Sequence, residues 1–254
     1  MLSVPRSRRP DCLLTCVSGI VLVLPKNLST ELSESVDDYL KAILELGGSR
    51  GTPITTNALA ERLNVRAPSV TGMLKKLAAQ RPALILYKKR EGVWLSAAGA
   101  RRAWELVRHH RLLELFLHDV LKYSWDEVHE EAERLEHFIS ERFEDRVAAI
   151  LGDPEFDPHG HAIPAKHGAG VYRKETSLWE WPLHEPALIT SVSDRSAANL
   201  RDLERRQMRP GARLVVESRN GSSTIAVRLE KQEQAIRLEK ELANCVLVAA
   251  ISRA

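Results

Sequence analysis

The stretch ITTNALAERLNVRAPSVTGMLKKLAAQ, residues 54–80, decides the fold expected for the first half of the chain. Apolar residues return at helical spacing on either side of the short turn NVRA. Thr55 or Thr56 can cap the first of these helices, because a hydroxyl side chain accepts hydrogen bonds from the first free N–H groups. Pro68 suits the first turn of the second helix. The stretch therefore predicts two helices joined by a tight turn.

One further helix is expected before this pair and a β-hairpin after it. The segment SESVDDYLKAILEL, residues 33–46, places four apolar residues on one helical face, namely Val36, Leu40, Ile43 and Leu44. The segment ALILYKKREGVWLSAAG, residues 83–99, is typical of two strands around a tight basic turn at Glu91 and Gly92. Helix, helix, turn, helix and hairpin together make a winged helix-turn-helix, expected over residues 31–100.

The remainder of the chain divides into a helical part and a β part. Residues 101–165 contain a long helix to about residue 120, another over 125–143 and a further helical stretch over 140–151. Residues 152–164 are rich in Pro, Gly and Asp and are interpreted as a connection, and 166–181 as a linker. Residues 182–254 show short alternating segments, which predict a small β-barrel of about five strands. The fold class expected is therefore mainly α, with a C-terminal β-barrel.

Charge is distributed unevenly along the chain. Residues 60–111 contain 12 Lys and Arg against 3 Asp and Glu, a net charge of +9. Residues 112–157 contain 4 against 14, a net charge of −10. A basic block followed by an acidic block indicates a surface for a polyanion beside a surface for cations, whereas the plainer alternative is ordinary fluctuation between helices.

The first 30 residues stand apart from the rest of the sequence. Three arginines precede an apolar run from Cys12 to Leu24, as in a secretory signal, but the run is short for a membrane span. We interpret residues 1–30 as a disordered extension or as the product of a start codon assigned too far upstream. The cysteines Cys12, Cys16 and Cys245 have no zinc-knuckle or redox spacing, which fits a reducing cytoplasm.

A stripe of metal-type ligands lies in DEVHEEAERLEHFIS, residues 126–140. Its members share one face of a predicted helix, being four, seven and eight residues from the first: His129, Glu133, Glu136 and His137. His110 and Glu114, one turn apart, add a second pair on the preceding helix, and Asp38 could close one site. Oxygen and imidazole ligands without thiolate favour Mn²⁺ or Fe²⁺. Taken singly, each residue has a plainer explanation as a solvated charge or a helix histidine.

The second predicted helix of the winged domain has the composition of a recognition helix. Small and polar residues occupy its N-terminal end, where base edges are reached, followed by two lysines: Arg66, Ala67, Pro68, Ser69, Thr71, Gly72, Lys75 and Lys76. The tip of the predicted wing adds three cations for the phosphate backbone, Lys88, Lys89 and Arg90. The alternative is a three-helix bundle that merely has the same helix order.

With these motifs in place, residues 32–164 resemble the diphtheria toxin repressor family of metal-dependent transcriptional regulators. The matching phrases are VDDYLKAILEL, ALAERLNVRAPSVTGMLKKL, RHHRLLELFL, VHEEAERLEH and DPHGHAIP. Residues 182–251, with RPGARLVV, resemble the Src-homology-like (FeoA-like) domain of longer members. The resemblance implies that residues 101–165 bind metal and form a homodimer.

The resemblance also implies two metal sites per subunit. One would use Asp38, Glu133, Glu136 and His137, and the other, ancillary site would use His110, Glu114 and His129. Asp157 stands where some manganese-responsive members have a further ligand. Iron-responsive members have Met and Cys where this chain has Asp38 and Glu133, so oxygen ligands favour Mn²⁺ over Fe²⁺.

Two departures from the family pattern bear on these sites. Lys41 takes the place of a glutamate that compact manganese regulators have, which disfavours a closely bridged pair of ions. The C-terminal domain has no carboxylate at the positions where longer members donate to the ancillary site. Asp194 or Asp202 could substitute for the missing ligand.

The hypothesis is a cytoplasmic, homodimeric repressor that binds a double-stranded DNA operator when Mn²⁺ is bound, with Fe²⁺ as the alternative ion. It is expected to be no enzyme and to use no membrane or small organic substrate. Three rivals remain. A di-metal helical-bundle enzyme lacks its paired Glu-x-x-His motif, since Arg134 and Val107 precede His137 and His110 by three residues. A metal-independent winged-helix DNA binder and a secreted or membrane-associated protein are the others.

Overall fold

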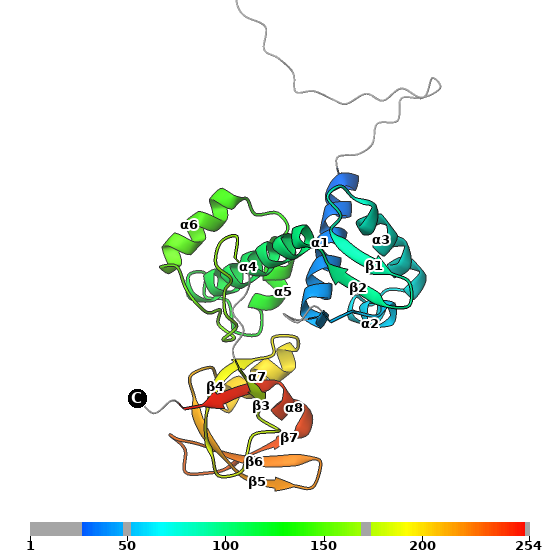
Figure 1. Cartoon of the computed structure of the whole chain (residues 1–254). Coiled ribbons are helices and arrows are strands. Elements are labelled where there is room, and N and C mark those ends of the chain that lie inside the picture. The colour runs from blue at the N-terminus through cyan, green and yellow to red at the C-terminus, as the bar shows by residue number, and fades with distance from the viewer. Residues whose placement is uncertain (1–26, 48–51, 169–173, 252–254) are drawn as a thin grey trace, which may run out of the picture.

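The computed structural model describes residues 27–47, 52–168 and 174–251 (Figure 1). Most of the segment interpreted as an extension, residues 1–30, lies outside the described residues. In the described part, no helix is both long enough and apolar enough to cross a lipid bilayer.

The N-terminal domain has the helix order that the sequence predicts, followed by the hairpin. Its elements are α1 (Asn27–Gly47), α2 (Thr56–Arg62), α3 (Ala67–Ala79), β1 (Ile85–Lys88) and β2 (Gly92–Leu95). Thr55 is the cap of α2, and its side chain accepts from the backbone N–H of Ala58. The strands pair antiparallel, with Lys88 opposite Gly92, so the turn at 89–91 forms the wing. The predicted inner faces are buried in one core, which includes Leu40, Leu59, Val70, Leu74 and Leu77.

Three helices form the middle of the chain: α4 (Ala97–Asp119), α5 (Val128–Leu135) and α6 (Glu141–Leu151). The long helix α4 runs from the winged domain past α1 and α5 to α6 (Figure 1). The helix predicted over 125–143 was wrong in extent. It stops at Leu135 because the chain turns there, and Ser140 then caps α6 by accepting from Phe143 N–H. Glu136 and His137 therefore lie in the turn that follows α5.

The C-terminal domain is an antiparallel sheet with two short helices. Its elements are β3 (Thr176–Ser177), β4 (Pro186–Val192), α7 (Ala197–Arg205), β5 (Arg213–Asn220), β6 (Thr224–Leu229), β7 (Ile236–Glu239), α8 (Lys240–Asn244) and β8 (Val246–Ala250). The strand order is β3-β8-β4-β5-β6-β7, and β3 lies within the segment predicted as a linker.

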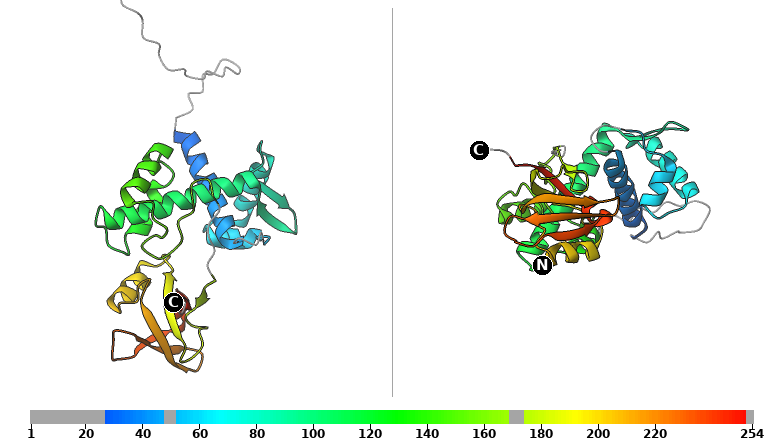
Figure 2. Two further views of the ribbon diagram at one scale, coloured as in Figure 1. Left: turned by 60° about the vertical axis from the view of Figure 1, so that its left-hand side comes forward. Right: turned by 90° about the horizontal axis from the view of Figure 1, so that it is seen from below.

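The predicted β-barrel was wrong, because the six-stranded sheet does not close. Its end strands β3 and β7 lie at opposite ends of the order and do not pair with each other. Alternation of apolar residues shows which face of each strand is buried, but it does not show whether the end strands meet. Figure 2 shows the resulting open sheet beside the helical part of the chain.

The C-terminal domain is attached to the helical domain by buried contacts. Trp125, between α4 and α5, is buried within the core of the C-terminal sheet, and its indole N–H donates to Pro158 O at 3.0 Å. The backbone N–H of Val192 donates to His159 O at 2.9 Å. These contacts place the loop that follows β4, residues 193–196, against the face of α4 and α5 that bears the histidines.

A substitution at Gly160 is expected to loosen this attachment. A Cβ there would lie 2.1 Å from Thr190 O, and the backbone φ is +88°, so both strain and a clash would result. Gly211 is a matched control, since its φ is also +88° but a Cβ would meet nothing within 4 Å. We expect Gly160→Ala to lower the free energy of unfolding by clearly more than Gly211→Ala, for which strain alone costs about 1 kcal/mol. Urea denaturation of both variants measures this, and equal losses would contradict a close approach at Gly160.

Candidate metal centre

A buried cluster of histidines surrounds Glu114 on α4. His110 Nε2 lies 3.0 Å and His129 Nδ1 lies 3.1 Å from the same Glu114 oxygen. Glu114 has no exposed surface, and His110 is buried beside it. The structure thus brings together the three residues that the resemblance assigns to the ancillary site.

The C-terminal domain contributes a carboxylate to this cluster. Asp194 Oδ2 lies 3.6 Å from His129 Nδ1, and Asp194 forms a set with His110, Glu114 and His129 whose ligand atoms all lie within 4.8 Å of one another. Of the two carboxylates expected to substitute there, Asp194 is the one present. Asp202 instead pairs with Arg205 and Arg206 of its own helix region, at 3.0 Å each.

A second set shares Glu114 and includes residues of the connection before the linker. Asp157, His159 and Glu114 also have ligand atoms within 4.8 Å of one another, and all three are buried. His159 Nδ1 lies 3.7 Å from Glu114 Oε1, and His161 Nδ1 lies 3.2 Å from Asp157 Oδ2. Asp157 is therefore near the ancillary cluster.

The donor atoms of this cluster fit a divalent ion. Glu114 Oε2 and His159 Nδ1 are buried and have no hydrogen-bond partner among the described residues, a costly arrangement without a ligand. His159 Nε2 lies 3.0 Å from Trp125 O, and because a carbonyl only accepts, this nitrogen donates its proton there. Nδ1 is then the nitrogen that faces Glu114, and although burial lowers the pKa of His159, the Glu114 carboxylate outweighs burial and raises it. Such orientation of a histidine by a backbone carbonyl is characteristic of metal-ligating imidazoles.

The first predicted site is arranged differently, with a lysine between its carboxylates. The Lys41 ammonium lies 2.8 Å from both oxygens of Glu136 and 3.3 Å from Glu133 Oε1. His137 Nε2 lies 3.2 Å from Asp38 Oδ1 and 3.7 Å from Glu136 Oε1. Within the described part of the chain, the four predicted ligands do not form a compact set like the one around Glu114.

Glu136 links the two clusters. Its Oε2 lies 2.5 Å from His110 Nδ1, while Lys41 Nζ lies 3.3 Å from the same nitrogen. A continuous chain of charged contacts therefore runs from Lys41 on α1, through Glu136 after α5, to His110 and Glu114 on α4.

Protons balance much of the carboxylate charge in this arrangement. Burial lowers the pKa of His110, but the Glu114 carboxylate outweighs burial and raises that pKa to about 10. Burial likewise opposes protonation of His137, yet its contacts with Asp37 and Asp38 raise its pKa to about 10. For Lys41, burial lowers the pKa, while Glu136 and Glu133 more than compensate and raise it, so the ammonium stays charged.

Two histidines of this region were missed from the sequence. His159 and His161 belong to DPHGHAIP, residues 157–164, which was interpreted as a connection and as a phrase of the family resemblance, with Asp157 as its one candidate ligand. Both lie near the cluster because this connection folds back between α5 and β4. Two histidines flanking a glycine next to an aspartate were the available signal.

The residues predicted to contact DNA are all at least partly accessible. Arg66 caps α3, and the described surface exposes Pro68, Ser69, Gly72 and both lysines of the helix, while Ala67 and Thr71 are half-buried. A Cβ at Gly72 would meet nothing within 4 Å. Lys88, Lys89 and Arg90 are exposed at the wing, with Lys88 paired to Glu91 at 3.0 Å. The helix α3 and the wing thus both carry exposed basic side chains.

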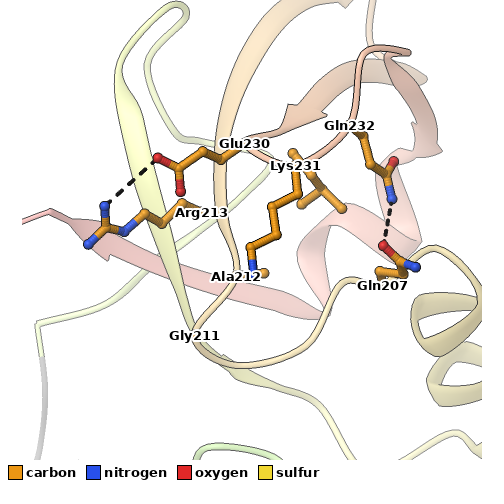
Figure 3. A pocket seen from close by; sticks show the side chains of 8 residues that line it. Gln207, Gly211, Ala212, Arg213, Glu230, Lys231 and Gln232 are labelled. Carbon is orange, nitrogen blue, oxygen red and sulfur yellow. Dashed lines mark hydrogen bonds and ion pairs between the residues drawn. The ribbon is translucent and has the colours of Figure 1, made fainter.

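A cavity of about 460 Å³ lies in the C-terminal domain, lined by residues of the turns before β5 and after β6 (Figure 3). Its polar residues pair with each other, as in Arg213 with Glu230 at 3.9 Å and Gln232 with Gln207 at 3.2 Å. None of the clustered histidines or carboxylates lines it.

A winged helix-turn-helix joined to a buried histidine–carboxylate cluster defines the class of metal-responsive DNA-binding regulators. Comparison with family models supports this class. Residues 31–93 match the N-terminal DNA binding domain of iron dependent repressors, residues 96–165 match their metal binding and dimerisation domain, and residues 176–250 match the FeoA domain.

Individual relatives show the same similarity. The iron-dependent repressor IdeR of Mycobacterium tuberculosis is 34% identical over 141 residues, which is 56% of this chain and 60% of the relative. A solved manganese-dependent transcriptional repressor in complex with manganese is 33% identical, with a TM-score of 0.78 over 85% of this chain and 100% of that one. ScaR with bound Zn²⁺ is also 33% identical, with a TM-score of 0.72 over 85% of this chain and 99% of that one.

The chain belongs to the diphtheria toxin repressor family of metal-dependent transcriptional repressors. It spans 60% of the length of the Mycobacterium tuberculosis and Mycobacterium bovis relatives that it matches. The family comprises repressors rather than enzymes, which agrees with the expectation from sequence.

Metal binding is expected to release protons. His110 and His137 hold protons up to a pH of about 10 in the structure described, but an imidazole ligates a metal only when neutral. The apparent affinity for Mn²⁺ should therefore rise as the pH is raised from 6.5 and level off above about 10. Calorimetric titration at pH 7.5 in buffers of different ionisation enthalpy measures the protons released. An affinity independent of pH would contradict ligation by these histidines.

Proposed function

We propose that this chain is a Mn²⁺-dependent transcriptional repressor that binds a DNA operator as a homodimer, with Fe²⁺ as the alternative ion. The observation that carries the proposal is the cluster around Glu114. Its buried atoms Glu114 Oε2 and His159 Nδ1 have no hydrogen-bond partner among the described residues, and Glu114 is connected through His110 to Lys41 on the helix α1 of the winged domain. Oxygen ligands at Asp38 and Glu133, in place of sulfur, support Mn²⁺.

The two sites would use ligands from different parts of the chain. The ancillary site would use His110, Glu114, His129 and Asp194, with Asp157 and His159 at its edge. The first site would use Asp38, Glu133, Glu136 and His137. A bound divalent ion would supply a concentrated positive charge that ties these carboxylates and imidazoles together.

The positions of the ligands in the fold would make DNA affinity depend on the bound ion. Asp38 lies on α1, which is packed into the core of the winged domain through Leu40 and Ile43. Glu136 and His137 belong to the helical domain. Fixing α1 against the turn after α5 would fix the direction of α3 and the separation of two recognition helices in a dimer, and successive major grooves require one set separation. Because the ion would bind this DNA-competent arrangement more tightly than other arrangements, the ion would favour it.

The α5–α6 region offers the surface for the homodimer. Apolar side chains on it remain exposed, namely Leu135, Phe138, Phe143 and Ile150, with Phe138 61% and Ile150 64% exposed. Large apolar side chains that remain exposed within so short a stretch are typical of an interface. The region lies within the segment that matches a metal binding and dimerisation domain.

A charge within this surface is expected to block the dimer. Phe138→Glu would bury an unpaired carboxylate at the interface, which costs several kcal/mol, so we expect a monomer. Light scattering after size exclusion measures the mass, with Leu183→Glu as a control, since Leu183 is exposed but lies in the C-terminal domain. A dimer in both variants would place the interface elsewhere.

The central test is operator binding with and without metal. Fluorescence anisotropy of DNA from the protein's own upstream region is measured in chelator, with Mn²⁺, with Fe²⁺ under anaerobic conditions and with Zn²⁺. We expect salt-sensitive binding that requires Mn²⁺. Asp194→Asn should weaken the Mn²⁺ response at least tenfold, while Asp202→Asn, in the same domain but paired with arginines, should not.

Equal DNA binding with and without metal would overturn the proposal in favour of a metal-independent winged-helix protein. Binding that responds to Fe²⁺ but not Mn²⁺ would favour the iron-responsive alternative. If Glu133→Ala and His137→Ala leave the metal response intact, the first site plays no part in it.

A further inference from the structure

Lys41 is the one ammonium that the described residues place inside the ligand clusters. It lies on α1, is 7% exposed, and donates to both oxygens of Glu136 at 2.8 Å. Glu133 Oε1 and His110 Nδ1 complete its surroundings at 3.3 Å each. Its charge thus stands between two carboxylates assigned to the first site and a histidine assigned to the second.

In this geometry Lys41 and a metal ion would compete for the same two carboxylate oxygens of Glu136. A charge-assisted hydrogen bond from a buried ammonium is among the stronger polar contacts in proteins, and Lys41 directs them to both oxygens of one carboxylate. An ion bound by Glu136 would also lie within a few ångströms of the ammonium, where two positive charges repel strongly away from bulk water. Both effects favour either the ammonium or the ion, and disfavour the two together.

We propose that Lys41 is a built-in competitor for the first site, which a divalent ion has to displace from Glu136 before it binds there. The proposal rests on the proposed function, because it concerns the same site. Lys41 then determines the ion concentration at which the first site fills. Without a competitor, four acidic and imidazole ligands would hold an ion more tightly and at lower concentration.

Displacement of the Lys41 ammonium would change the residue through which α1 contacts the helical domain. Asp38 lies one helical turn before Lys41 and is half-exposed, 3.2 Å from His137. While the ammonium holds Glu136, α1 is joined to the helical domain through Lys41. Once the ammonium leaves, Asp38 and Glu136 become ligands of one ion, and α1 is joined through Asp38. Binding of the ion would thus change which turn of α1 is attached to the helical domain.

The test compares Lys41→Leu, which removes the charge and cannot ligate, with Lys41→Arg, which retains a charge. Mn²⁺ titration calorimetry is performed on the full chain and repeated with His129→Ala and Asp194→Asn together, which remove two ligands of the second site and so weaken it relative to the first. We expect Lys41→Leu to bind Mn²⁺ at the first site at least tenfold more tightly than the wild type, and Lys41→Arg to remain within about threefold of it. Lys122→Leu is the control, since Lys122 is exposed and donates only to a backbone carbonyl of Asp119.

Thermal unfolding gives a second readout that needs no DNA. In chelator, Lys41→Leu should unfold at a lower temperature than the wild type because Glu136 loses its buried partner, and Mn²⁺ should abolish the difference. Equal or weaker Mn²⁺ affinity of Lys41→Leu would overturn the proposal, as would the same gain in Lys41→Arg.

These outcomes are distinguishable from failure of the proposed function. If Lys41→Leu binds Mn²⁺ more tightly but DNA binding ignores Mn²⁺, the repressor function fails and the competition stands. If the wild type responds to Mn²⁺ and Lys41→Leu shows no gain, only the competition fails. If neither chain binds Mn²⁺, both fail.

Discussion

The buried carboxylate of Glu114 is the constraint on which the arrangement of the domains depends. An ionised carboxylate removed from water is tolerated only when positive charge and hydrogen-bond donors surround it. Glu114 draws these from three directions: His110 from its own helix, His129 from α5 and His159 from the connection that precedes the C-terminal domain. Elements that are far apart in sequence therefore meet at one point because a single charge has to be compensated there.

The C-terminal domain completes this meeting point through apolar packing elsewhere. Trp125 is buried in the core of the open sheet, and Gly160 lets the backbone of the connection approach Thr190 closely. Neither residue is a ligand. Their packing nevertheless fixes the loop after β4, and so places Asp194 beside His129. Burial of apolar residues stabilises the contact between the domains, and this contact positions the polar residues of the cluster.

The sequence predicted the local features well and the long-range ones less well. Helical spacing was sufficient for the winged domain and for pairing His110 with Glu114, because residues one turn apart share a face, whereas the grouping of His129 with this pair came from the family resemblance. It could not show that α5 ends at Leu135, since the turn there depends on the cap of α6, or that the sheet stays open. His159 and His161 were missed because their proximity to Glu114 and to Asp194, respectively, comes from chain reversal, for which periodicity carries no signal.

Charge balance explains why the two clusters differ. Around Glu114 the compensating groups are imidazoles, which can give up a proton and then offer a lone pair to a cation. At Glu136 an ammonium is present beside the imidazole of His110, and while charged it has no lone pair to offer a metal ion, so it can only remain or leave. Since Glu136 also contacts His110, a change of charge at either cluster alters the balance at the other. The helix that carries Lys41 packs into the core of the winged domain, so under the proposed function a change in this balance would bear on the orientation of α3.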